Sequence, residues 1–437
     1  MNRDSTVISD PLRQCHYLVI CSLCNKEFLD DGYILQCPVC LNDSLLRSSY
    51  RNPVFSAAPN QDGLYRYRNW LPISRTIQGA GKSITLQSDS LSKLTGLKNL
   101  WLAFSGYWPE KNGSLPTGSF KELEAYCVLS RFPHKSSRIL TVASAGNTAA
   151  AFAHICSHSN IPCLVFVPDF ALPKLRFSTP INSCVRVIAV TDGGDYMDAI
   201  RAANAITESP LFAPEGGVRN IARRDGLATV LLNAFEIVGR LPDYYFQAIG
   251  SGTGAIAVNE AARRITRGES PLPRLFLSQN SPFTPIYDTW KAREKRWTPL
   301  QEPEAKLQIA QMVAPVLANR MPPYSVRGGL YEALIESKGD VLAITNEEAM
   351  AAAQIFEQCE GIDLEPAAAV SLASLLKALA SKSIPTDATV LLNLTGGGNR
   401  RYASDFELLP CKPNLKLSSK MIGTPEMTPL ILRLFGI

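Results

Sequence analysis

Short apolar runs and amphipathic helical patterns alternate along most of the chain beyond residue 121. The apolar runs have the length of strands and lie at 139–143, 163–167, 185–191, 244–249, 275–277 and 390–394. The helical patterns lie at 149–156, 196–206, 228–239, 255–264 and 347–357. This alternation predicts a parallel sheet flanked by helices. An earlier run at 100–104 is another candidate strand, and the less regular stretch 297–339 is predicted to form a lid or an interface.

The composition is that of an ordinary globular enzyme. The chain has 437 residues, of which 46% are apolar and 19% charged, so it is long enough for two domains and a small appendage. The net charge of +5 is spread along the chain, without a cluster of Lys and Arg interleaved with aromatic residues. We therefore expect no nucleic-acid partner. A basic active site for anionic substrates is the more natural use of this charge.

Two features bear on where the protein works. Residues 1–13 are polar and mixed in charge, and no apolar run approaches the length that spans a bilayer. We therefore expect neither a signal peptide nor contact with a membrane. The 11 cysteines are an odd number with one cluster near the N-terminus. That distribution indicates a reducing cytoplasm and a metal site rather than a disulfide framework.

The clustered cysteines form two Cys-x-x-Cys pairs separated by 12 residues, namely Cys21, Cys24, Cys37 and Cys40. Two residues between paired cysteines turn both sulfurs toward one point, and two such pairs complete a tetrahedral site for zinc. All four ligands are cysteines, so no position stays open for catalysis and the metal is predicted to be structural. Cys15 and His16 lie nearby but are surplus to the count. Four free thiols are the alternative, and a zinc ribbon can also bind nucleic acid or protein.

A lysine and a loop of small residues carry the clearest indication of chemistry. Lys121 follows a Gly-Ser-Phe turn, and an amine in this setting can form a Schiff base with the aldehyde of pyridoxal phosphate (PLP). The loop 144–148, Ser-Ala-Gly-Asn-Thr, joins a predicted strand to a predicted helix, where free backbone N–H groups suit an anionic group. Asn147 in this loop can hydrogen-bond the phenolic oxygen of the cofactor. The order and spacing of the two features predict a PLP enzyme.

A glycine-rich turn, Gly250-Ser251-Gly252-Thr253-Gly254, follows an apolar run and precedes an alanine-rich helix. Glycines allow the backbone to approach a ligand closely, and the helix N-terminus presents N–H groups to a phosphate. A dinucleotide site is the rival interpretation. However, the third glycine stands at 254 instead of 255, and the nearest candidate for the fingerprint's carboxylate, Glu269, precedes the next strand instead of ending it. A tight turn without a ligand is the remaining alternative.

Thr395 closes the last apolar run and is followed by three glycines. Ligands collect at the carboxyl ends of parallel strands, which places Thr395 beside the same crevice. A neutral hydroxyl that faces the pyridine nitrogen of PLP leaves this nitrogen largely unprotonated, which suits elimination and replacement reactions. A glycine-rich loop with a capping threonine is the alternative.

The segment 214–226 holds three arginines ahead of a helix, namely Arg219, Arg223 and Arg224. Arginine is well shaped to grip phosphate, sulfonate or carboxylate with two nitrogens. The alternative is that they are solvated surface residues. The four histidines of the chain form no spacing typical of a metal site or a catalytic triad, and we expect His154 and His158, four residues apart at a helix end, to be structural.

These motifs together resemble the threonine synthase family of fold-type II PLP enzymes, from the cysteine pairs to about residue 399. The matching segments are 116–121, 144–148, Glu365-Pro366-Ala367 and Thr395-Gly396. The resemblance implies an α/β fold of two parallel-sheet domains with the cofactor between them, plus an N-terminal zinc ribbon. The implied parts are a ribbon at 1–50, a large PLP-binding domain at 51–120 and 210–400, a small α/β domain at 121–209 and a C-terminal tail at 401–437.

The resemblance also implies roles for single residues. Lys121 would be the catalytic lysine that carries PLP, and Asn147 would contact the PLP oxygen. Thr395 would face the pyridine nitrogen, and the turn 250–254 would hold the PLP phosphate. The loop of Ser144, Ala145, Gly146 and Thr148 would bind the substrate carboxylate, and Arg223 would grip the substrate phosphate.

Two departures from the family pattern narrow the resemblance. Threonine synthases follow the lysine with Asp-Arg-Gly, whereas this chain has Glu122-Leu123-Glu124. They also carry Lys-x-Glu ahead of the lysine, where this chain reads Phe-Ser-Gly-Tyr-Trp-Pro-Glu-Lys at 104–111. Both replacements resemble the cysteate synthase branch. That branch implies a β-replacement in which O-phospho-L-serine and sulfite give L-cysteate and phosphate.

Other interpretations stay open at this point. The chain could be a threonine synthase that acts on O-phosphohomoserine, or it could use sulfide or thiosulfate in place of sulfite. It could also be a catalytically silent relative whose ribbon binds a partner. The family resemblance implies a homodimer. The sequence does not decide whether the product enters coenzyme M biosynthesis or another sulfonate pathway.

Overall fold

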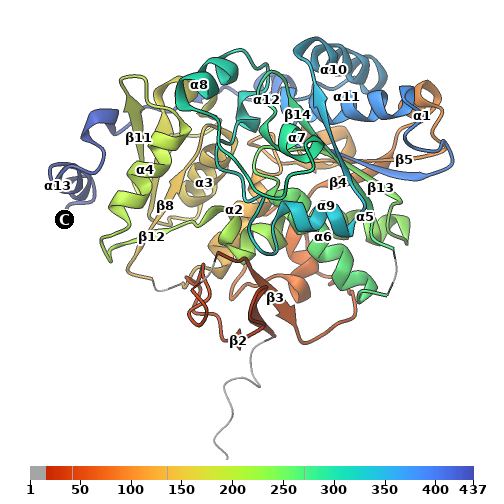
Figure 1. Ribbon diagram of the computed structural model, residues 1–437. Helices are drawn as coiled ribbons and strands as arrows, with labels where there is room; N and C mark the ends of the chain where they lie inside the picture. Colours follow the sequence, from red (N-terminus) through yellow and green to blue (C-terminus); the bar gives the residue numbers. More distant parts are fainter. Residues whose placement is uncertain (1–15, 42, 135, 270) are drawn as a thin grey trace, which may run out of the picture.

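The computed structural model describes residues 16–41, 43–134, 136–269 and 271–437. Within these residues, two main sheets flanked by helices lie side by side, and a small three-stranded sheet lies at the N-terminal end (Figure 1). Residues 1–13 and Cys15, considered in the sequence, lie outside the described residues. None of the helices within the described residues is both long and apolar enough to cross a membrane.

The smaller main sheet has five parallel strands in the order β12-β8-β9-β11-β18. In this order they are Phe212–Pro214, Ile139–Ala143, Cys163–Pro168, Val185–Thr191 and Leu415–Ser418. Along β9, Leu164 and Phe166 pack in the core that contains α4 (Tyr196–Ile206), whereas Val165 packs in the core that contains α3 (Asn147–His158). Successive residues of a strand point to opposite faces, so helices cover this sheet on both sides.

The larger sheet has six strands in the order β15-β14-β13-β16-β5-β4. In this order they are Asp340–Ile344, Arg274–Asn280, Tyr244–Ala248, Thr389–Leu394, Asn99–Phe104 and Ile84–Gln87, and only β4 is antiparallel to its neighbour. Phe246 of β13 packs in the core of α10 (Asn346–Glu360) and α11 (Pro366–Ala380). Tyr245 packs in the core of α5 (Ile221–Val238) and α6 (Thr253–Thr266) on the opposite face.

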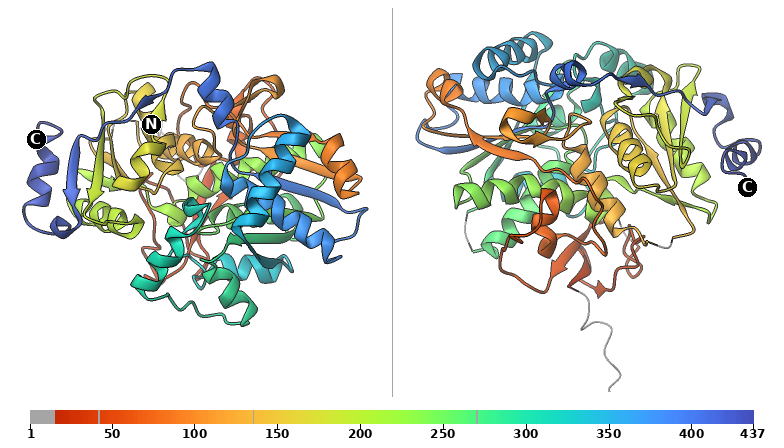
Figure 2. Two further views of the ribbon diagram at one scale, coloured as in Figure 1. Left: turned by 90° about the horizontal axis from the view of Figure 1, so that it is seen from above. Right: turned by 180° about the vertical axis from the view of Figure 1, so that it is seen from behind.

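The remaining elements connect these layers. The other helices are α1 (Asp89–Thr95), α2 (Lys121–Arg131), α7 (Pro285–Lys291), α8 (Glu302–Ala310), α9 (Leu330–Glu336), α12 (Asn399–Asp405) and α13 (Met427–Arg433). Two short antiparallel pairs are β6 (Tyr107–Trp108) with β7 (Gly113–Ser114) and β10 (Arg176–Phe177) with β17 (Leu409–Pro410). Figure 2 shows the segment after α12 crossing the molecule to the edge of the smaller sheet, where α13 and the C-terminus lie.

The N-terminal sheet consists of β1 (Tyr17–Cys21), β2 (Glu27–Phe28) and β3 (Leu46–Tyr50) and packs against the helices that carry the site. Asp225 of α5 accepts hydrogen bonds from Ser48 Oγ at 2.6 Å and from Tyr50 Oη at 2.8 Å. On α2, the buried Arg131 forms an ion pair with the buried Asp30 at 2.6 Å. Because these charges are buried and paired, they fix the ribbon in one position against α2 and α5.

The periodic elements agree with the sequence-based expectation, and the structure differs from it at three places. Helix α5 begins at Ile221, seven residues before the predicted start at 228. The prediction missed its first two turns because Arg224 and Asp225 are charged yet buried in ion pairs, which no hydrophobic pattern reveals. The segment 401–437, predicted to be a tail, supplies β18, which pairs in parallel with β11. Likewise β12, beyond the predicted boundary at 209, belongs to the smaller sheet.

Candidate active site

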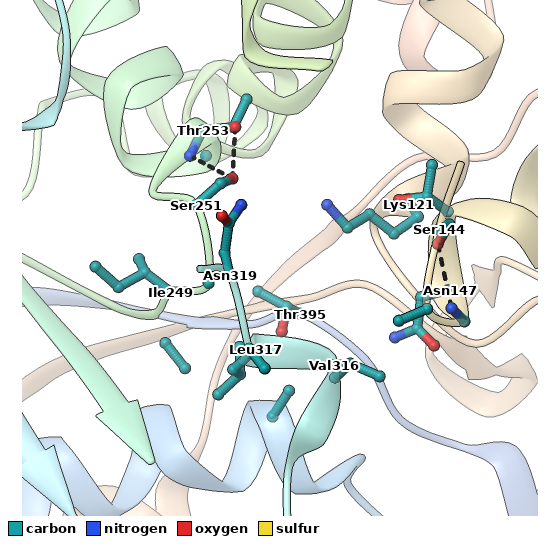
Figure 3. A pocket seen from close by; sticks show the side chains of 18 of the residues that line it. Lys121, Ser144, Asn147, Ile249, Ser251, Thr253, Val316, Leu317, Asn319 and Thr395 are labelled. Carbon is teal, nitrogen blue, oxygen red and sulfur yellow. Dashed lines mark hydrogen bonds between the residues drawn. The ribbon is translucent and has the colours of Figure 1, made fainter. Parts of the chain in front are cut away.

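The carboxyl ends of strands from both main sheets meet at one cavity. The loop 144–148 follows β8, the turn 250–254 follows β13, and Thr395 follows β16; all three line this cavity together with Lys121 (Figure 3). Ligands of parallel sheets bind at the carboxyl ends of the strands, so this cavity is the candidate active site. The structure thus brings together all the predicted cofactor residues and the predicted substrate loop, although the binding roles themselves stay predictions.

Lys121 is the first residue of α2, a helix that the hydrophobic pattern did not reveal. The turn ahead of it requires glycine, because Gly118 has φ +67° and a Cβ there would lie 2.0 Å from the Asn399 Oδ1 atom. The backbone N–H of Phe120 donates to the Thr395 carbonyl at 3.0 Å. These contacts tie Lys121 to the end of β16, and its side chain, 23% exposed, points into the cavity (Figure 3).

The loop 144–148 forms the start of α3. Gly146 has φ +153°, a region that favours glycine, and its N–H donates to Ser144 Oγ at 3.1 Å. The amide of Asn147 donates to Glu365 Oε2 at 2.6 Å, and burial raises the pKa of the Glu365 carboxyl. Glu365 belongs to a motif that the sequence singled out without a role. The structure shows that it fixes the orientation of Asn147 at the cavity.

The glycine turn 250–254 forms the opposite end of the cavity. Gly250 passes so close to another backbone that a Cβ would lie 2.8 Å from the Leu317 carbonyl oxygen. Thr253 begins α6, and its hydroxyl lies 2.7 Å from Ser251 Oγ (Figure 3). The first N–H groups of a helix have no partner within the helix, and together they attract an anion. This end therefore fits a phosphate group.

Four charged side chains gather at the Lys121 end. Lys121 Nζ lies 3.2 Å from Glu124 Oε2, and Arg223 Nη2 lies 2.9 Å from Glu124 Oε1. The Arg223 Nε atom forms a second ion pair with Glu215 at 2.8 Å. Burial lowers the pKa of Lys121 and raises the pKa of Glu215. Arg223, predicted to grip the substrate phosphate, thus lies at the cavity, but two of its three guanidinium nitrogens form ion pairs with buried carboxylates.

The irregular stretch 297–339 contributes one wall of the cavity. Val316, Leu317 and Asn319 line it around a short 3₁₀ turn at Pro315–Leu317. Arg320 just beyond forms an ion pair with Asp195 Oδ2, at the start of α4, at 2.7 Å. The stretch was predicted to be a lid or an interface, and the structure shows that it borders the site.

Sequence reasoning did not assign several of the lining and contacting residues to the site: Glu124, Tyr196, Glu215, Gln247 and Asn319. Of these, only Glu124 gave a signal in the sequence, as part of the departure from the lysine motif. The others are single polar residues at scattered positions, and no spacing marks them. The site draws them from separate elements, which only the tertiary fold brings together.

The residues present fit pyridoxal phosphate. An amine stands at one end of the cavity, a glycine turn with a helix N-terminus stands at the other, and Thr395 with its neutral hydroxyl lies between them (Figure 3). At the glycine turn, the close approach of Gly250 to the Leu317 carbonyl leaves no room for a side chain. The only charged groups that line the cavity within the described residues are Lys121 and Arg223. This arrangement suits an aldehyde at the lysine and a phosphate at the turn.

The four cysteines of the N-terminal sheet form the candidate metal centre. Their sulfur atoms all lie within 4.8 Å of one another, with Cys21 and Cys40 at 3.7 Å and Cys24 and Cys37 at 3.6 Å. Zinc–sulfur bonds of about 2.3 Å in a tetrahedron place the sulfurs about 3.8 Å apart. The backbone N–H groups of Leu23 and Cys24 point at Cys21 Sγ, at 3.4 and 3.5 Å. The cluster is therefore compatible with zinc.

Comparisons with known proteins agree with this geometry. Residues 79–396 match the family described as pyridoxal-phosphate dependent enzyme. The chain is 40% identical to a cysteate synthase of Methanosarcina acetivorans over 415 residues, which cover 94% of this chain and 99% of the relative. It is 42% identical to a cysteate synthase of Methanosarcina barkeri over 412 residues, which cover 93% of this chain and 98% of the relative.

Solved structures show the same fold at low sequence identity. Maize serine racemase superposes with a TM-score of 0.54 at 16% identity, over 74% of this chain and 92% of that chain. An L-serine ammonia-lyase from the fungus Rhizomucor miehei gives a TM-score of 0.56 at 13% identity, over 74% of this chain and 98% of that chain. These likenesses confirm the predicted fold-type II architecture.

Proposed function

This chain belongs to the family of pyridoxal-phosphate-dependent enzymes and, within it, to the cysteate synthases, and we propose that it converts O-phospho-L-serine and sulfite to L-cysteate and phosphate. The observation that carries the proposal is the similarity to cysteate synthases over nearly the whole chain. The cavity supports it, because an amine and a phosphate-binding turn face each other across a space lined by the predicted residues.

Each predicted cofactor contact has a place in this cavity. The turn 250–254 would hold the PLP phosphate, Asn147 would contact the phenolic oxygen, and Thr395 would face the pyridine nitrogen. When bound, PLP supplies an electron sink for the negative charge that develops at the substrate Cα atom. A neutral threonine at the nitrogen limits this delocalisation, which favours replacement at Cβ.

The chain's own residues handle the proton and the anions. Lys121 would anchor the cofactor and, once released, take the Cα proton at Nζ and later return it. The backbone N–H groups of 144–148 would bind the substrate carboxylate at the start of α3. Arg223 offers its Nη1 atom, which has no hydrogen bond to a described residue, to the substrate phosphate. The Cβ–O bond to phosphate breaks, and a Cβ–S bond to sulfite takes its place.

Product analysis of the purified, PLP-loaded protein tests the proposal. Phosphate release is measured from O-phospho-L-serine and from O-phosphohomoserine, each with and without sulfite, and the products are identified by mass. We expect cysteate from phosphoserine plus sulfite only. Threonine formed from phosphohomoserine without regard to sulfite would show a threonine synthase instead. Release of phosphate without either product would keep the PLP chemistry and exclude sulfite as the nucleophile.

The four cysteines are proposed to hold a structural zinc ion. Their spacing supports this, and all four ligand positions are filled by protein. Metal analysis should find one zinc per chain, and Cys24→Ser should lower both the zinc content and the thermal stability. Cys359→Ser, at a half-buried cysteine on helix α10, is the matched control and should keep the zinc content. Full zinc content and wild-type stability of Cys24→Ser would contradict the proposed site.

The protein is further proposed to be a homodimer that works in the cytoplasm. The family resemblance supports the dimer, and the cysteines of the described residues, all free thiols, suit a reducing compartment. Light scattering after size-exclusion chromatography measures the first point, and a monomer would overturn it. Whether the product enters coenzyme M biosynthesis is a separate proposal, which deletion of the gene and assay of the coenzyme would test.

A further inference from the structure

Glu124 is a fully buried carboxylate beside the predicted catalytic lysine. Its side chain is 0% exposed, and its Oε2 atom lies 3.2 Å from Lys121 Nζ. Its Oε1 atom accepts a hydrogen bond from Thr148 Oγ1 at 2.9 Å and forms an ion pair with Arg223 Nη2 at 2.9 Å. Both oxygens are therefore occupied, by donors from three different helices: α2, α3 and α5.

A carboxylate in the first turn of a helix is often explained by the helix dipole alone. Glu122 lies in the same turn, but its Oε1 atom accepts the backbone N–H of Thr117, ahead of the helix, at 2.6 Å instead of pairing with Lys121. Glu124 differs, since it is turned toward Lys121 and held there by Thr148 and Arg223. Charges buried at this depth need compensation, and the structure supplies it on the side of the reactive amine.

We propose that Glu124 is a positioning residue that holds Lys121 Nζ at the cavity and stabilises its protonated form. The inference rests on the proposed function, in which Lys121 takes and returns the Cα proton. Glu124 makes no contact with the cavity itself, so it acts through Lys121.

The charges around the Lys121 amine determine which protonation state of the amine is favoured. Glu124 and Glu215 are the anions, Arg223 is the second cation, and the Tyr196 hydroxyl of α4 is the remaining titratable group that faces them. With Lys121 protonated, two cations balance two anions. With Lys121 as a neutral amine, the cluster carries one excess negative charge, which the Cα proton neutralises when Nζ takes it. Glu124 thus favours the proton transfer that starts the reaction and keeps the proton close for its return.

The test measures the protonation of Lys121 directly, apart from turnover. The full-length protein, freed of PLP, is labelled with trace acetic anhydride over a pH series, and acetylation of the Lys121 peptide is quantified by mass spectrometry. In Glu124→Gln, we expect the midpoint of the labelling curve to fall by about one pH unit or more, because an opposite charge at this distance favours the ammonium. Glu122→Gln, the matched control from the same helical turn, should leave the midpoint unchanged.

Two more variants separate direct action from indirect effects. Glu215→Gln removes the other carboxylate that pairs with Arg223 but does not touch Lys121. It should move the Lys121 midpoint much less than Glu124→Gln. An equal shift would show that the effect passes through Arg223 and would overturn the proposal, as would an unchanged midpoint in Glu124→Gln. If Glu124→Gln does not fold, Glu124→Asp keeps the charge at a longer distance and should shift the midpoint in the same direction by less.

Kinetics of the PLP-loaded enzyme complete the test. Glu124→Gln should lower kcat about tenfold or more and change KM for phosphoserine by a smaller factor, because Glu124 contacts Lys121 directly and reaches the substrate only through Thr148 and Arg223. A rise in KM with unchanged kcat would overturn the proposal. Absence of turnover in the wild-type protein would refute the proposed function alone, since the labelling experiment on Lys121 does not depend on the substrate.

Discussion

The two ends of the cavity differ in the groups that face it: backbone N–H groups and hydroxyls at the glycine turn, and charged side chains at the lysine end. At the glycine turn, backbone N–H groups and the hydroxyls of Ser251 and Thr253 face the cavity, without a charged side chain within the turn. At the lysine end, Glu124 forms ion pairs with both Lys121 and Arg223, and Arg223 forms a second ion pair with Glu215.

The difference follows from what each end has to do. A phosphate keeps its charge throughout the reaction, so fixed dipoles at a helix N-terminus are sufficient to bind it. The amine of Lys121 has to change its charge, and its surroundings therefore have to compensate both states. In the proposed reaction, phosphate binding would thus be left to the backbone, whereas proton transfer would require a cluster of side chains whose charges are balanced.

Removal of Lys121 should have the largest effect. We expect Lys121→Ala to lower turnover about 10²- to 10⁴-fold, because the general base is lost. The bound cofactor should also lose the visible absorbance of its link to the protein, which spectrophotometry measures. Lys174→Ala, a change of an exposed lysine in the neighbouring cavity, is the control and should keep the absorbance. An unchanged spectrum of Lys121→Ala would mean that the chain is a silent relative.

The buried Glu122 lies in the same helical turn as Glu124 but has no ion pair among the described residues, which allows a test of how an unpaired buried carboxyl affects stability. Burial raises the pKa of Glu122 to about 7, and its Oε2 atom has no hydrogen bond to a described residue. Because the folded-state pKa lies above that of an unfolded chain, the wild type should lose stability as pH rises between these two values, by up to about 3 kcal/mol. Glu122→Gln should lack this loss.

Urea unfolding of wild type and Glu122→Gln, at a pH below 5 and again near 8, measures the difference. The gap between the two proteins should widen in favour of the variant at the higher pH, where the buried wild-type carboxylate is ionised and only the N–H and hydroxyl of Thr117 compensate its charge. At the lower pH both side chains are neutral, and their stabilities should be close. A gap that does not depend on pH would show that Glu122 is not buried in the neutral form.

Sequence reasoning was sufficient to place the glycine turn between its strand and helix, because these elements belong to one continuous segment, whereas the role of the turn in phosphate binding stays a prediction. A strand, three glycines and a helix predict a phosphate site from spacing alone, and the structure shows these elements at β13, the turn 250–254 and α6. Strands β8 and β11 and helix α4 likewise follow the expected residues, since their hydrophobic periodicity is complete within each segment.

The lysine end shows where such reasoning stops. Lys121 was found from its motif, but helix α2 was missed, because all of its residues from Glu122 to Arg131 are buried and no polar face interrupts them. Glu124, Glu215 and Arg223 come from α2, a loop and α5, and only the packing of these elements brings their charges together. Arg223 lines the cavity, whereas its contact with the substrate phosphate stays a prediction, and its two ion pairs have no sequence signature.

A side chain added to the glycine turn should have the next largest effect, on the affinity for PLP. In Gly250→Ala, the added Cβ would meet the Leu317 carbonyl at 2.8 Å, so the turn or the adjoining wall has to shift. Such strain costs about 1–3 kcal/mol, and we expect PLP affinity to fall about 10- to 100-fold. Fluorescence titration with PLP measures it. Gly239→Ala at the end of α5 has φ +77° and open space around it, so it should affect stability but not PLP affinity.

The smallest effect is expected from a single hydroxyl at the glycine-turn end. Thr253→Val keeps the shape of the side chain but removes the hydroxyl that lies 2.7 Å from Ser251 Oγ. Because the backbone N–H groups of α6 remain, the loss should be about 1 kcal/mol, or about a fivefold weaker binding of PLP. Thr141→Val is the matched control, since the Thr141 hydroxyl is buried in β8 without a hydrogen bond to a described residue and does not line the cavity. If Thr253→Val weakened binding as much as Gly250→Ala, the hydroxyls and not the backbone would dominate phosphate binding, and the contrast between the two ends would have to be drawn differently.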